Sequence, residues 1–161
     1  MSLLILSVDP GTARTGYCWN VMNDHSLWST IDKGIVRITP PNYGELDEWL
    51  DTWGDKSPEQ FDRFFVLCEE YIQRNRDSNG KPITDKWIKQ GTAAIFGSVH
   101  REAHRFRASF IRTRPANLSI GCKLAGIRDY QGHLPDDLSA QAHAAYFCVH
   151  GIPQPNAGWL R

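Results

Sequence analysis

The chain has 161 residues, of which 41% are hydrophobic and 22% are charged, so we expect a single domain over residues 1–161 with a substantial core. Its 18 Lys and Arg residues balance its 18 Asp and Glu residues, and this net charge of +0 does not by itself indicate a polyanionic partner. No apolar stretch is long enough to span a membrane and the N-terminus lacks a secretory signal pattern, which argues against the membrane-spanning and secreted classes.

The cysteines and tryptophans have structural explanations. The cysteines lie among apolar residues without the paired spacing of a zinc site; they are Cys18, Cys68, Cys122 and Cys148. This pattern predicts buried free thiols in a reducing, cytoplasmic compartment. The tryptophans in apolar patterns, which favour core packing over stacking on bases, are Trp19, Trp28, Trp49 and Trp87.

Three strands are predicted in the first part of the chain. An apolar run over residues 3–8 has the length of a strand buried on both faces, and Asp9 follows directly. Residues 15–22 and 25–38 are rich in aromatic and branched side chains and predict two more strands, joined by a hairpin turn at 23–24.

Helices and strands alternate in the remainder. We expect a helix over 45–53, a buried strand over 63–71, a helix over 86–107, a short strand over 109–115 and a closing helix over 135–151. The polar segment 73–85 predicts a mobile loop. This order predicts an α/β fold with a five-stranded mixed sheet, in which three antiparallel strands join two parallel strands and helices cover both faces.

Carboxylates stand at three corresponding points of this predicted sheet. Asp9 ends the first strand, Glu69 ends the fourth, and Asp136 and Asp137 begin the closing helix. Singly, each acid is explained as a turn former or a helix cap. If the first and fourth strands are neighbours, however, the acids meet at one edge and repel one another unless cations are bound. Together they predict a site for Mg²⁺ or Mn²⁺, with two ions suited to phosphodiester hydrolysis.

Basic side chains gather away from the acidic segment 45–62. The candidate contacts to DNA are Arg74, Arg76 and Lys81 in the polar loop and Arg101, Arg105 and Arg107 before the fifth strand. A solvated helix face is the simpler explanation of such a charge run. The near-absence of acids over 101–114 favours instead a local surface for DNA phosphates.

Three segments carry patterns of a known family: "SVDPGTARTGY", "FVLCEE" and "HLPDDLSAQAHAAYF". They resemble, in order, the first strand, the fourth strand and the last helix of RuvC-type Holliday-junction resolvases in the RNase H-like nuclease superfamily. The first segment is the most specific, and the element order agrees over nearly the whole chain. The resemblance implies an RNase H-like fold in a compact, phage-like member. It also implies a homodimer, because two strands are cut symmetrically.

The resemblance implies roles for residues on the strands. Asp9 would be the first metal-bridging carboxylate and Glu69 the second, with Glu70 as the reserve. In these resolvases a side chain just after the catalytic glutamate helps to open the junction, and here Tyr71 or Ile72 would take that place.

The closing helix departs from the family pattern of two ligands three residues apart, the second followed by alanine. Three alignments stay open: His133 with Asp136, a register that takes Asp137 as the ligand, and Asp136 with Ser139. We expect Asp136 and Asp137 in direct contact with the metal or next to it. His143 lies six residues after Asp137, near the opposite helical face, and is expected to act less directly.

The leading prediction is a Mg²⁺-dependent endonuclease that resolves Holliday junctions or other branched DNA in recombination or phage DNA processing, leaving a 5′-phosphate and a 3′-hydroxyl. Two alternatives keep the fold: a nuclease acting on RNA or flaps, and a catalytically inactive nucleic-acid-binding module. The segment "DPGTARTG" also resembles the phosphate-binding hairpin of actin-like ATPases. Those proteins need two such domains, which 161 residues cannot hold.

Overall fold

Five strands form one mixed sheet in the computed structural model, which describes residues 1–11, 13–23, 27–39, 42–70, 81–82, 86–128 and 133–151. The strands are β1 (Ser2–Pro10), β2 (Arg14–Asn23), β3 (Leu27–Arg37), β4 (Arg63–Glu69) and β5 (Ser109–Thr113). Their order is β3-β2-β1-β4-β5; β1, β2 and β3 pair antiparallel, whereas β1, β4 and β5 run parallel. The predicted mixed sheet is therefore confirmed.

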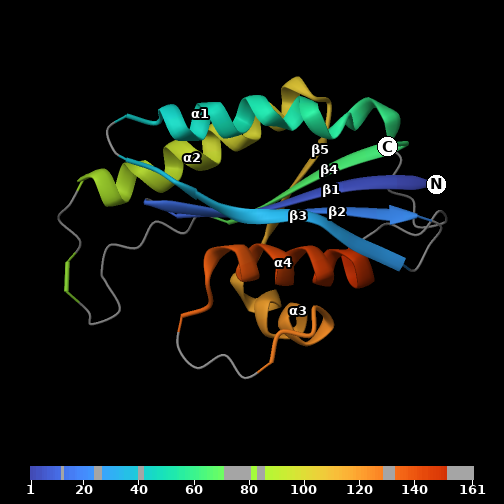
Figure 1. Ribbon diagram of the computed structural model, residues 1–161. Helices are drawn as coiled ribbons and strands as arrows, with labels where there is room; N and C mark the ends of the chain where they lie inside the picture. Colours follow the sequence, from blue (N-terminus) through green and yellow to red (C-terminus); the bar gives the residue numbers. More distant parts are fainter. Residues whose placement is uncertain are drawn as a thin grey trace.

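Helices cover both faces of the sheet, as predicted (Figure 1). One face carries α1 (Gly44–Asp51) and α2 (Lys86–Arg105), and the other carries α3 (Leu118–Leu124) and α4 (Asp136–Tyr146). Short 3-10 turns occupy Thr52–Lys56, Pro58–Gln60 and Pro115–Asn117, and a π-helical turn, Phe147–Gly151, continues α4. The sequence patterns did not predict α3, which packs on α4 through Gly121: a Cβ there would overlap the backbone of Ala142.

Strand alternation divides the core into two clusters. On the side of α1 and α2, Leu4, Leu6 and Val8 of β1 pack with Trp19 and other aromatic residues. On the side of α4, Leu3, Ile5, Phe65, Leu67 and Phe147 form the second cluster. Burial of each such side chain contributes about 1.5–3 kcal/mol. Asp9 and Glu69 continue the alternation of the second cluster, so the fold directs both toward α4.

The tryptophans and cysteines lie largely where the sequence predicts. Trp19, Trp49 and Trp53 are buried in the first cluster and Trp28 is partly buried against the second, while the side chain of Trp87 lies outside the described residues. All four cysteines are free, and all except the partly exposed Cys122 are buried. In the described part of the chain, no helix has the length and apolarity needed to cross a membrane.

Candidate metal and nuclease site

Asp9 and Glu69 meet at one edge of the sheet because they end neighbouring parallel strands. The register pairs Val8 of β1 with Cys68 of β4, so the two carboxylates occupy the next positions along their strands. Since both follow the alternation of the α4-facing cluster, they lie on the same face as well as at the same edge. This confirms the predicted neighbourhood of the first and fourth strands.

Gly16 brings the N-terminus of α4 to this edge. It lies directly opposite Asp9 in the antiparallel register of β1 and β2. A Cβ at Gly16 would overlap the carbonyl group of Asp136 and lie 2.5 Å from the backbone nitrogen of Asp137. The glycine of the "TGY" segment is therefore required so that the first turn of α4 can pack against β2 beside Asp9.

Two buried side chains of α4 hold the two carboxylates. A hydrogen bond joins the side chain of Ser139, which is 3% exposed, to Asp9. One helical turn later, Nε2 of His143 lies 2.9 Å from Oε2 of Glu69, and His143 is 1% exposed. An ionised carboxylate only accepts hydrogen bonds, so Nε2 carries the proton in this pair. The opposite nitrogen, Nδ1, is buried without a hydrogen-bond partner among the described residues.

Burial and like charges raise the pKa of Asp9 from 3.8 to about 6. The largest cause is removal of the carboxylate from water, followed by the negative charge of Glu69; Asp136 adds a smaller increase. The hydrogen bond from Ser139 and the charge of His143 act in the opposite direction. Burial and like charges therefore disfavour the ionised form of Asp9, and a bound cation would stabilise it.

The structure separates Asp136 from Asp137. Asp136 lies close enough to raise the pKa of Asp9, and its Oδ2 is 3.7 Å from Nε of Arg14. Asp137 instead acts on Cys18, whose pKa is raised mainly by burial and slightly by this carboxylate. Asp136, Ser139 and His143 therefore share the helical stripe that faces the strand ends, which is the geometry of the alignment pairing Asp136 with Ser139.

The remaining acidic and histidine candidates lie apart from this stripe. Glu70 follows the end of β4, and its backbone N–H donates to the carbonyl oxygen of Thr113 at 2.8 Å. Strand alternation places its side chain on the face opposite to Glu69. His133 is exposed, with Nδ1 2.8 Å from the carbonyl oxygen of Leu134. The structure thus brings Asp9, Glu69 and Asp136 together with Ser139 and His143, and does not bring Glu70 or His133 to them.

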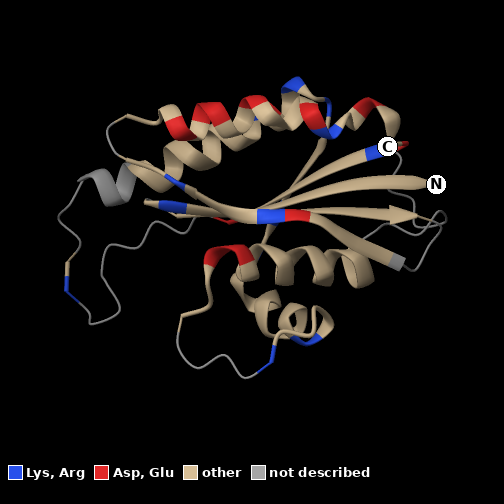
Figure 2. Ribbon diagram, in the orientation of Figure 1, with Lys and Arg blue, Asp and Glu red and all other residues tan. Residues whose placement is uncertain are grey.

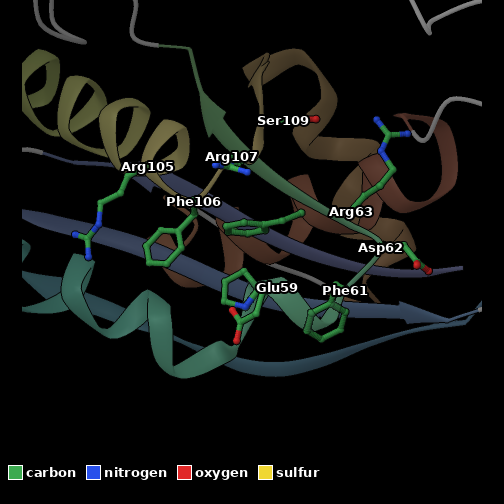
Figure 3. A pocket seen from close by; sticks show the side chains of 10 residues that line it. Glu59, Phe61, Asp62, Arg63, Arg105, Phe106, Arg107 and Ser109 are labelled. Atoms are coloured by element: carbon green, nitrogen blue, oxygen red, sulfur yellow. The ribbon is translucent and has the colours of Figure 1, made fainter.

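The arginines before β5 lie at the opposite end of the sheet. Arg105 contacts Glu102 at 2.9 Å and lies 3.9 Å from Asp51. Together with Arg107 it lines a hollow of about 520 Å³ at the first residues of β4 and β5. Figure 3 shows Arg105, Phe106 and Arg107 along one side of this hollow. The six residue steps of β4 place it about 20 Å from Glu69.

The remaining basic residues predicted to contact DNA are only partly described by the structure. Arg101 is exposed on the same helix, α2, one turn before Arg105, and Lys81 is exposed beyond β4. Arg74 and Arg76 lie outside the described residues, as do Tyr71 and Ile72.

Two arginines that the sequence patterns did not single out stand near the carboxylates. Arg14 and Arg37 occupy directly opposite positions in the register of β2 and β3, two residues from the Gly16 pair. Arg14 lies within the segment "DPGTARTG", so the sequence could have indicated it. Arg37 could not be found in this way, because only the strand register shows that it lies opposite Arg14.

The donor set fits a hard divalent cation. Among the described residues, no group of three or more Asp, Glu, His or Cys side chains is close enough to enclose a metal ion. Mg²⁺, however, is usually held by one or two carboxylates together with substrate phosphates and water rather than by an all-protein cage. Asp9 and Glu69 would supply those carboxylates, and burial, followed by the negative charge of Glu69, raises the pKa of Asp9.

The fold is shared with solved resolvase structures. RuvC of T. thermophilus in complex with a Holliday junction substrate matches with a TM-score of 0.63 and 13% identity, over 94% of this chain and 95% of that chain. A second Thermus thermophilus RuvC structure gives 0.58 and 15%, over 94% and 97% of the two chains. The yeast mitochondrial Holliday junction resolvase Ydc2 gives 0.51 and 12%, over 89% and 77%.

Comparison of the sequence with family models and with curated proteins identifies no related protein. At the identities above, the structural likeness establishes the fold, which is the RuvC-type, RNase H-like fold.

Proposed function

We propose that the protein is a metal-dependent endonuclease that resolves four-way DNA junctions by phosphodiester hydrolysis. The observation that carries the proposal is the meeting of Asp9 and Glu69 at the ends of adjacent parallel strands, with Asp136 beside them on α4. The shared fold supports the same conclusion, since the solved structures with this fold include a RuvC described with a Holliday junction substrate.

Each residue of the site has a defined task in this proposal. Asp9, Glu69 and Asp136 would hold Mg²⁺, which when bound supplies Lewis-acid activation of the scissile phosphate and of water. Ser139 orients Asp9 by hydrogen bonding, and His143 orients Glu69 by donating from Nε2. Such outer partners set the direction and basicity of metal-binding side chains.

The decisive experiment replaces the partly buried carboxylate of Asp9. Asp9→Asn should lower the rate of junction cleavage by about 100-fold or more, because several kcal/mol of charge stabilisation are lost. Binding of a labelled four-way junction should survive. Asp55→Asn, which changes an exposed acid far from the site, is the matched control and should cut like the unmodified protein. Cleavage by Asp9→Asn at the unmodified rate would refute the assignment.

The substrate is tested by offering a four-way junction, a flap, a DNA duplex and an RNA–DNA hybrid under the same conditions. Resolution requires symmetric paired nicks on the junction. Preferential cutting of the flap or the hybrid would assign the same site to a different nuclease activity. Paired nicks also require two active sites related by two-fold symmetry, so we propose a homodimer on the junction, which sedimentation of the complex would reveal.

A further inference from the structure

A basic strip lies beside the carboxylates on the β2–β3 hairpin. It consists of Arg14 at the start of β2, and Arg37 and Lys33 on β3. Figure 2 shows basic segments at the left end of the sheet, above the acidic N-terminus of α4. The hairpin register sets this arrangement, because Arg14 pairs with Arg37, and Lys33 pairs with Cys18 four positions along.

All three side chains of the strip belong to the face that carries α4. Arg14 reaches toward Asp136, the first residue of α4, at 3.7 Å. Nζ of Lys33 donates to Oε1 of Gln141 on the same helix at 2.9 Å. Since directly paired residues share a face, Arg37 lies on this side together with Arg14. Asp32, which directly precedes Lys33, faces the other way and pairs with Lys56 at 2.8 Å.

The charges of the strip are poorly balanced within the protein. Arg14 has 66% of its side chain exposed and meets Asp136 only at 3.7 Å. Arg37 is exposed, and its side chain makes no hydrogen bond or ion pair within the described part of the chain. Two like charges directly opposite on neighbouring strands are destabilising. An arrangement that costs stability in the free protein is explained by an anionic ligand that needs both guanidinium groups.

We propose that Arg14, Arg37 and Lys33 bind the phosphodiester backbone of the DNA strand that passes the carboxylates. This inference rests on the proposed nuclease function and deepens it. The four residue steps from Arg37 to Lys33 cover about 13 Å of β3. Along the axis of duplex DNA, that length equals the rise of about four nucleotides of one strand. The strip offsets the repulsion between the backbone and Asp9, Glu69 and Asp136, and its contacts to phosphates carry no sequence information.

The test measures junction binding against salt, in buffer without divalent metal so that nothing is cleaved. Arg37→Gln is the cleanest variant, because the Arg37 side chain has no hydrogen bond or ion pair with the described residues to lose. Its affinity at 0.1 M salt should fall by about 8-fold, and the slope of log K against log salt should decrease by about 0.9, as expected for one lost phosphate contact. Arg14→Gln with Arg37→Gln should lose about twice that slope. Arg37→Lys should retain it.

Lys123→Gln is the matched control, since Lys123 is exposed on α3, which packs on α4. Its affinity and slope should equal those of the unmodified protein. Unchanged binding by the double variant, or an equal loss in the control, would overturn the inference. Failure of the proposed function is seen separately, as absence of metal-dependent cleavage by the unmodified protein, whereas failure of this inference is seen in the variants' salt slopes.

Discussion

Replacing Asp9 by Asn should make the metal-free protein more stable at neutral pH, although it destroys the proposed site. Asp9 is packed between the sheet and α4, with its pKa raised from 3.8 to about 6 by burial and by the charge of Glu69. Asparagine removes the charge and keeps an oxygen that can accept the hydrogen bond from Ser139.

The magnitude follows from the two pKa values. Because the native carboxyl holds its proton more tightly than the unfolded chain does, ionisation costs native stability. Below pH 3.8 the group is protonated in both states and there is no cost. Stability then falls as the pH rises from 3.8 to about 6, and the whole cost remains at higher pH. At about 1.4 kcal/mol per tenfold change in proton affinity, the cost is about 3 kcal/mol.

The assay is thermal unfolding of the unmodified protein, Asp9→Asn and the exposed control Asp55→Asn, in chelator, at pH 8 and near pH 3.5. A gain of about 3 kcal/mol corresponds to a rise in Tm of about 6–12 °C for a domain of this size. We expect that rise at pH 8 and only a small one near pH 3.5, with the control unchanged at both. If Asp9→Asn were no more stable at pH 8, or equally stabilised at both pH values, the cost assigned to ionising Asp9 by burial and by the charge of Glu69 would be refuted.

Three further outcomes test the packing of the site. Gly16→Ala should lower the Tm and abolish cleavage, because its Cβ would displace the first turn of α4 at Asp136; a far-UV spectrum of native shape would show that the sheet remains. His143→Ala should raise the Mg²⁺ concentration for half-maximal cleavage by about 10–100-fold, since Glu69 loses its only described donor, and His143→Gln should recover part of the loss. Phe147→Ala removes a core ring that is 4% exposed, so urea unfolding should show a loss of about 3–5 kcal/mol, whereas a loss under 1 kcal/mol would contradict the assigned cluster.

The sequence was sufficient for the strand ends and insufficient for α4. Asp9 and Glu69 were predictable because each follows an apolar run that can only be a buried strand, and parallel neighbours end at the same edge. For α4, three alignments with the family's ligand pattern were possible, and the sequence alone cannot say which face of the helix contacts the sheet. The close approach at Gly16 decides it: the stripe of Asp136, Ser139 and His143 faces the strands. His143 lies on this stripe, one turn after Ser139, and the spacing from Asp137 used in the sequence analysis did not reveal that position.

The short helix α3 escaped prediction for a different reason. Its residues, Leu118–Leu124, span only two turns, too few to display an amphipathic period. The helix is stabilised by contact with α4 through Gly121, which has no side chain to signal a packed position. Elements that depend on tertiary contact rather than on their own pattern are the ones a single sequence conceals.

Connectivity decides which basic residues can serve the carboxylates. Asp9 and Glu69 stand where β1 and β4 end, and β5 runs parallel to both, so its first residue, Ser109, lies at the opposite edge. The chain segment that leads into β5 must therefore also lie at that edge, and Arg105 and Arg107 belong to it. The β2–β3 hairpin lies differently, because its strands are antiparallel. β2 begins where β1 ends, and β3 ends where β2 begins, so Arg14 and Arg37 lie beside Asp9. A charge cluster in the sequence is thus a weaker guide to a DNA-binding edge than the direction of the strand it adjoins.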